Sequence, residues 1–169
     1  MPNWCYNTLK VKGKKSDRDA FASDMEKFCV ENHDITNGQP PVFDLNFCVR
    51  MPAEMLDTIS PTPLDLTEEQ QNHTDSLIKR FGVANWYDWA LSYWGTKWNT
   101  NGGHINETSR MTIYTFNTAW SPPENALDAL SKKYPHLAFH NKYSIEGYPG
   151  TWKNVYVNGT NKFSTLSKT

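Results

Sequence analysis

The sequence predicts an α+β fold in which two helices cover one face of an antiparallel sheet. Segments with a hydrophobic period of two alternate with segments of helical period, and Gly or Pro residues separate them. The chain has 169 residues, of which 38% are hydrophobic, and this length suits one buried core. We therefore expect a single domain over residues 1–169.

A strand and a helix are expected first. Residues 7–12 alternate Leu9 and Val11 with lysines, as in a strand with one buried face. The next segment has apolar side chains on one helical face, and Ser16 is its expected N-cap. These apolar side chains are Phe21, Ala22, Met25, Phe28 and Cys29.

A second strand is expected over residues 44–50, where Leu45, Phe47 and Val49 alternate with smaller or polar residues. The connection to the next strand, residues 51–109, is far longer than a hairpin loop. Connections of this length are usually functional or partly disordered. We treat it as an insertion between the second and third strands.

Two helices are expected inside this insertion. The first starts at a capping box on Thr67 and ends before Gly82. The second begins near Asn85, with Asn85 and Asp88 as caps, and has Trp86, Trp89, Ala90 and Tyr93 on one side. Residues 51–65 are rich in proline and are expected to form a loop.

The carboxyl-terminal half predicts a strand, a helix and a further strand. Residues 110–119 have substantial side chains on both faces, so this third strand should lie centrally. A capping box from Ser121 to Glu124 starts a helix that Pro135 closes, and residues 137–146 alternate again.

A terminal hairpin is expected over residues 150–165, with Asn158 and Gly159 in a type I′ turn. Without the insertion and this hairpin, the elements follow the βαββαβ order of ferredoxin-like folds. The predicted fold class is therefore α+β, ferredoxin-like, with a helical insertion and a C-terminal β-hairpin.

The charge balance and the cysteines limit the functional classes. The 17 basic and 18 acidic residues give a net charge of -1, so any contact with nucleic acid has to be local. Three cysteines without a CxxC pair argue against a disulfide framework and a cysteine zinc site. The start resembles no signal peptide and no apolar run is long enough to cross a membrane, so we expect a cytoplasmic protein.

A tryptophan-rich loop over residues 94–103 is the main candidate binding site. It combines two indoles, a lysine and small polar groups in a glycine-rich segment. Such a loop can present N–H groups and a cation to an anion, and indoles to a base or sugar. Alternatively, the indoles plug the sheet face and the lysine stem covers them. The expected site residues are Asn3, Trp4, Trp94, Gly95, Thr96, Lys97, Trp98, Asn99 and Trp120.

Catalysis and metal binding are weaker hypotheses. Asp88 and Glu146 are the carboxylates nearest the aromatic runs and could serve as acid or base, although helix capping and a strand end explain them equally. The five histidines lack metal-ligand spacing, and Cys5 is expected to be a buried thiol. We predict no catalytic residue, metal or cofactor.

Three runs of sequence, residues 1–7, 85–99 and 116–123, resemble the YubB-like family of phage- and plasmid-borne proteins. The resemblance spans nearly the whole chain. It implies a ferredoxin-like domain in the carboxyl-terminal part and an origin in a bacteriophage or other mobile element. It also implies an accessory role against host machinery or defence, by analogy of family.

The sequence thus favours a non-enzymatic binding protein that engages a host protein or a small anionic ligand through the tryptophan-rich insertion. One alternative is a nucleic-acid-binding module, because RNA-recognition domains share the strand order and Tyr114 and Phe116 could stack on bases. The other is an enzyme that acts on a nucleotide or host protein. The oligomeric state stays open.

Overall fold

The computed structural model describes residues 3–32 and 40–167, with side chains described as far as residue 161. A six-stranded antiparallel sheet has the order β2-β3-β1-β4-β5-β6. The four strands of the ferredoxin-like core are followed by a hairpin that extends the sheet beside β4. The strands are β1 (Trp4–Lys12), β2 (Asn101–Glu107), β3 (Thr112–Ala119), β4 (Ala138–Ile145), β5 (Thr151–Val157) and β6 (Thr160–Ser167).

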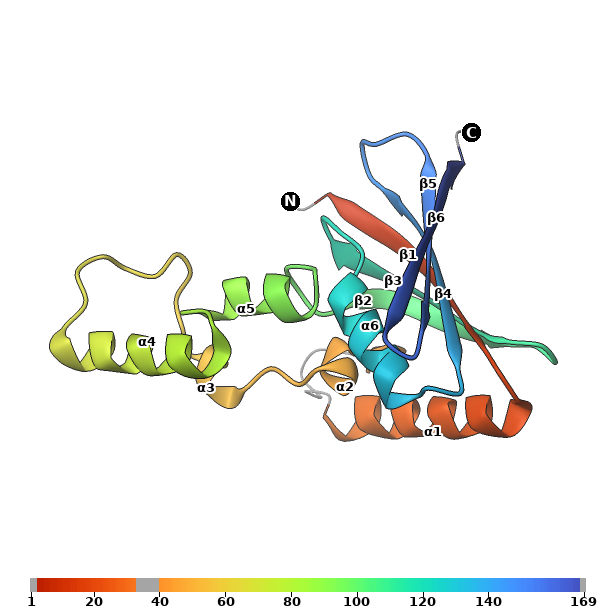
Figure 1. Ribbon diagram of the computed structural model, residues 1–169, viewed down its shortest axis with the longest axis horizontal. Helices are drawn as coiled ribbons and strands as arrows, with labels where there is room; N and C mark the ends of the chain where they lie inside the picture. Colours follow the sequence, from red (N-terminus) through yellow and green to blue (C-terminus); the bar gives the residue numbers. More distant parts are fainter. Residues whose placement is uncertain (1–2, 33–39, 168–169) are drawn as a thin grey trace.

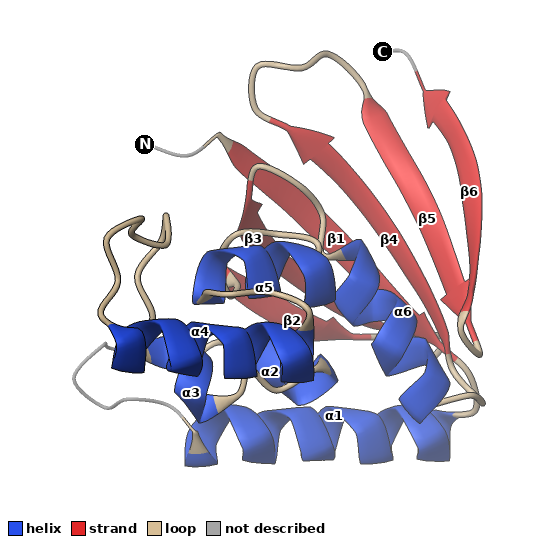
Figure 2. Ribbon diagram, turned by 60° about the vertical axis from the view of Figure 1, so that its left-hand side comes forward, coloured by secondary structure: helices blue, strands red, loops and turns tan. Residues whose placement is uncertain are grey.

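The described helices all lie on one side of this sheet (Figure 2). Helices α1 and α6 are the two helices of the βαββαβ order, and α3 and α4 project sideways from the sheet (Figure 1). The opposite face of the sheet has no described helix over it. The helices are α1 (Lys15–Glu31), α2 (Leu45–Cys48), α3 (Ala53–Leu56), α4 (Glu68–Phe81), α5 (Trp86–Tyr93) and α6 (Glu124–Lys133).

The predicted fold class is confirmed, but the predicted second strand is wrong. Residues 44–50 contain α2, whose N-cap Asp44 accepts a hydrogen bond from the Asn46 N–H at 2.8 Å. Leu45 and Phe47 are buried, as a strand would bury them, so a short helix satisfied the same alternation. The second strand is β2, and the helical insertion therefore lies between α1 and β2 instead of between the second and third strands.

Predictions of helix starts had mixed outcomes. The expected N-cap at Ser16 is wrong, because α1 begins at Lys15 and its N-cap residue makes no side-chain bond. The capping box at Ser121 is also wrong, since the N-cap of α6 is Pro123. The cap of α5 at Asn85 is confirmed by its bonds from the N–H groups of Tyr87 and Asp88.

The loop expected over residues 51–65 is wrong in part, because it contains α3. The turn of the terminal hairpin is confirmed: Asn158 has φ 47° and Gly159 has φ 70°, and a type I′ turn requires positive φ at both positions.

The capping box of α4 is confirmed in both directions. The Thr67 side chain accepts a bond from the Gln70 N–H, and the Gln70 side chain accepts one from the Thr67 N–H at 2.9 Å. We expect Thr67→Ala to destabilise α4 by about 1 kcal/mol. Amide hydrogen exchange across α4 should show faster exchange than in a Ser76→Ala variant at an exposed position of the same helix. Equal exchange in the two variants would contradict the capping role.

Candidate binding surface

The first indole of the predicted site belongs to the core. Trp94 follows α5 and is 4% exposed. Its Nε1–H donates to the Val49 carbonyl at 2.8 Å, and its ring packs edge-on against Trp89. The Trp94 indole is therefore closed to a ligand.

The next two residues fix the loop to the connection between β3 and α6. Thr96 is fully buried and its Oγ1 donates to the Ala119 carbonyl at 2.8 Å. The Gly95 carbonyl accepts a bond from Ser121 Oγ at 2.7 Å. A Cβ atom on Gly95 would lie 3.2 Å from the Glu124 backbone nitrogen, so this approach favours glycine.

Asn99 ties the end of the loop to α2. Its side-chain oxygen accepts a bond from the Leu45 N–H at 2.8 Å, and its amide donates to the Asp44 carboxylate at 2.7 Å. Trp94 is therefore buried, as the alternative interpretation of the loop expected, and Gly95, Thr96 and Asn99 make contacts that hold the loop in place.

The remaining loop residues form a group of rings around one cation. The Lys97 ammonium lies 4.5 Å from the ring centroid of Trp98, 4.6 Å from that of Trp120 and 5.7 Å from that of Tyr87. Trp98 is 39% exposed and Trp120 is 41% exposed. We call these four residues the Lys97 cluster. Each cation–π contact at such a half-exposed site contributes about 0.5–1 kcal/mol.

The sequence indicated three members of the Lys97 cluster but not Tyr87. On α5, Tyr87 lies outside the side that carries Trp86, Trp89 and Tyr93, and its ring meets Trp120 at 6.3 Å between centroids. Its position as an aromatic residue on the outer side of an amphipathic helix is the feature of the sequence that could have indicated Tyr87 as a site residue. The contact itself needs the tertiary structure.

The amino terminus lies at the same end of the sheet as Trp120. The Trp120 N–H donates to the Asn3 carbonyl at 2.9 Å, and Trp4 pairs with Ala119. Asn3 is exposed and Trp4 is half-buried. Trp120 also has φ 72°, a left-handed conformation that a bulky residue rarely adopts.

The two candidate acid or base residues make structural bonds. The Asp88 carboxylate accepts a bond from the Asn85 side-chain amide at 2.8 Å, and that of Glu146 accepts one from the Trp4 N–H at 3.0 Å. Both side chains are exposed. Cys5 is buried as predicted, and burial raises the pKa of its thiol to about 12.

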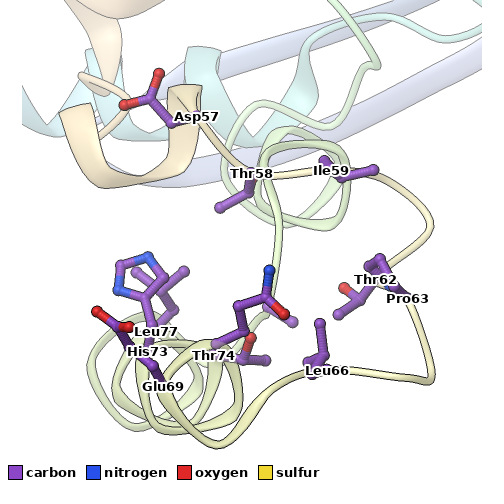
Figure 3. A pocket seen from close by; sticks show the side chains of 12 residues that line it. Asp57, Thr58, Ile59, Thr62, Pro63, Leu66, Glu69, His73, Thr74 and Leu77 are labelled. Carbon is purple, nitrogen blue, oxygen red and sulfur yellow. The ribbon is translucent and has the colours of Figure 1, made fainter.

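Two cavities lie away from the predicted site. One, of about 320 Å³, lies between α4 and the preceding segment, with His73 and Leu77 on one side and Ile59 on the other (Figure 3). The other, of about 630 Å³, lies between α1 and the β2 edge of the sheet. None of the nine predicted site residues lines either cavity.

The aromatics of β3 that suggested base stacking are not available for it. Tyr114 and Phe116 are each 1% exposed and contact Phe43, on the face of the sheet that the helices cover. This part of the nucleic-acid hypothesis is therefore wrong. An open-sheet site would need the side chains of the opposite face.

The fold and its family likeness define a ferredoxin-like protein. A family model described as the ferredoxin-like domain in Api92-like protein matches residues 93–166, less than half of the chain. The crystal structure of protein Api92 from Yersinia pseudotuberculosis is similar over 100% of both chains, with a TM-score of 0.51 and 10% sequence identity. This likeness shows the shared fold. No curated protein matches the chain.

The helices of the described residues are α1 to α6. None of them is both long and apolar enough to cross a membrane.

Proposed function

We propose that this protein is a non-enzymatic accessory binding protein and that the Lys97 cluster is where it engages a protein of the host cell. The observation that carries the proposal is the pair of half-exposed indoles, Trp98 and Trp120, held around one ammonium group. Tryptophan and tyrosine are the residues most enriched in the energetic centres of protein interfaces. The resemblance to the YubB-like family supports a mobile-element origin, and hence a host partner such as a defence component.

The backbone of Trp120 adds support. A left-handed conformation costs a residue with a Cβ atom about 1–2 kcal/mol, a cost that glycine would avoid. Here this strained position carries a large, half-exposed ring beside Lys97. Strained backbone is concentrated at functional sites, where surrounding structure holds it.

The rigidity of the loop also favours recognition. Trp94, Thr96 and Asn99 anchor the segment on both sides of Lys97 through bonds to the two ends of α2 and to the end of β3. A partner therefore meets side chains that are already positioned, which lowers the entropic cost of binding.

A capture experiment from host lysate tests the proposal. We expect Trp98→Ala to lose a captured host protein while its circular-dichroism spectrum stays native, because the ring is at the surface. Val157→Ala is the control and should retain the capture, since Val157 is 41% exposed and lies on β5 at the opposite end of the sheet from Trp4 and Trp120. Unchanged capture by Trp98→Ala would overturn the proposal. Loss of a small anion instead of a protein would assign the cluster to the second ligand class expected from the sequence.

A further inference from the structure

The face of the sheet opposite the helices collects positive charge from three strands. Directly paired residues of antiparallel strands share a face. Lys10 of β1 pairs with His140 of β4, and Lys142 of β4 pairs with Lys153 of β5. Lys12 lies two residues beyond Lys10 on the same face of β1. Four lysines and a histidine are thus neighbours on this surface, which we call the open face.

The strand positions of the open face also carry no acidic side chain, and Glu146, the first residue after β4, borders the face at the Trp4 end. In the described strands β1–β5, the positions whose side chains alternate onto this face include no Asp or Glu. Glu107, on β2, pairs with the buried Thr112 and therefore belongs to the other face. The chain has 17 basic and 18 acidic residues. The positive charge of this surface therefore comes from where the charged residues lie in the fold, and not from an excess of basic residues in the chain.

The pKa of His140 is affected by these lysines. Burial lowers the pKa of its imidazole, and the charges of Lys12, Lys153 and Lys10 lower it further. Three of the four lysines, Lys10, Lys12 and Lys153, therefore act on one imidazole. A polyanion laid across the sheet would meet all of them together.

An aromatic ring lies on the same face. Tyr6 of β1 is 47% exposed and pairs with Asn117 of β3 and Ser144 of β4. Lys10 is four residues further along the same strand, so ring and ammonium groups follow one line across the centre of the sheet. A ring at such a position can stack on an unpaired base, while neighbouring polar side chains can bond to base edges.

We propose that the open face binds single-stranded nucleic acid, with Lys10, Lys12, Lys142 and Lys153 contacting phosphates and Tyr6 stacking on a base. An unpaired strand exposes both its backbone and the flat faces of its bases, and the open face offers a partner for each. A duplex offers the phosphates alone to these side chains. This inference is independent of the Lys97 cluster, because that site is tested by capture of a host protein and either proposal can fail alone.

Fluorescence anisotropy with labelled 12-nucleotide single strands of DNA and RNA tests this inference across a salt series. Four phosphate contacts predict a slope of log K against log salt of about −3, since each contributes about −0.7. Lys10→Ala and Lys142→Ala should each make the slope shallower by about 0.7. Tyr6→Ala should weaken single-strand binding about tenfold and leave duplex binding unchanged.

Lys27→Ala is the matched control, because Lys27 is an exposed lysine of α1, the helix over the other face. It should bind the single strand like the unmodified protein. The inference is overturned by absence of binding, by equal losses in Lys27→Ala and Lys142→Ala, or by binding that Tyr6→Ala does not alter. Binding to anionic vesicles but not to oligonucleotides would likewise overturn it in favour of a lipid surface.

Discussion

Replacing Phe21 by alanine is expected to lower the free energy of unfolding by about 3–5 kcal/mol. Phe21 is fully buried at the centre of α1. Its ring meets those of Phe47, Tyr114, Tyr134 and Phe139 edge-on, with centroids 5.1–6.1 Å apart. These rings come from α2, β3, the end of α6 and β4, so one side chain joins the sheet to three helical segments.

Equilibrium unfolding in urea measures this effect. A loss of this size is a large part of the roughly 5–15 kcal/mol that stabilises an ordinary domain. Val30→Ala is the control, since Val30 lies in the same helix and is 61% exposed. It should change the unfolding free energy by no more than about 0.5 kcal/mol. A Phe21→Ala loss as small as that of the control would contradict the packing described for α1.

The sequence could predict the long elements with a clear pattern. β1, β3 and β4 follow from alternation, because each of these strands has one face against the helices, and the terminal hairpin follows from its turn residues. α2 was missed because a four-residue helix buries Leu45 and Phe47 just as a strand does. A pattern over so few residues does not separate the two periods.

β2 was missed for the opposite reason. All seven of its residues are exposed, so it has no buried face and no hydrophobic alternation. Its identity as a strand comes from pairing with β3, which is a long-range contact. Gly102 and Gly103 looked like loop residues for the same reason. The misplaced insertion follows directly from this one element.

The candidate site was likewise predictable from the sequence only in part. The sequence indicated that residues 94–99 matter together, but in an irregular segment no period tells which indole is buried. Trp94 and Trp98 differ because one lies against the end of α5 and the other lies beyond the anchored Thr96. Part of the open face was predictable, because the alternation of residues 7–12 places their lysines away from the core. That these lysines lie beside Lys142 and Lys153 depends on the strand order, which the sequence pattern does not give.

Of the Gly→Ala changes in the edge strand β2, Gly103→Ala is expected to lower the free energy of unfolding most. Gly103 has φ 115°, and a Cβ atom there would lie 1.9 Å from the Thr115 carbonyl oxygen. The obstacle is backbone, so β2 would have to move away from β3. The register shift between Asn101 and His104 shows that the strand is already irregular at this point. We expect a loss of about 3 kcal/mol or more in the free energy of unfolding.

The neighbouring glycine provides the control. Gly102 also has a positive φ, 61°, but a Cβ atom there would meet nothing within 4 Å. Gly102→Ala should therefore cost only the left-handed backbone conformation, about 1 kcal/mol. Urea unfolding gives the two losses, and hydrogen exchange of the β3 amides shows whether β2 has separated. Equal losses in the two variants would mean that Gly103 does not lie against β3, because both the contact with Thr115 and the less accessible φ of 115° should make Gly103→Ala the more damaging change.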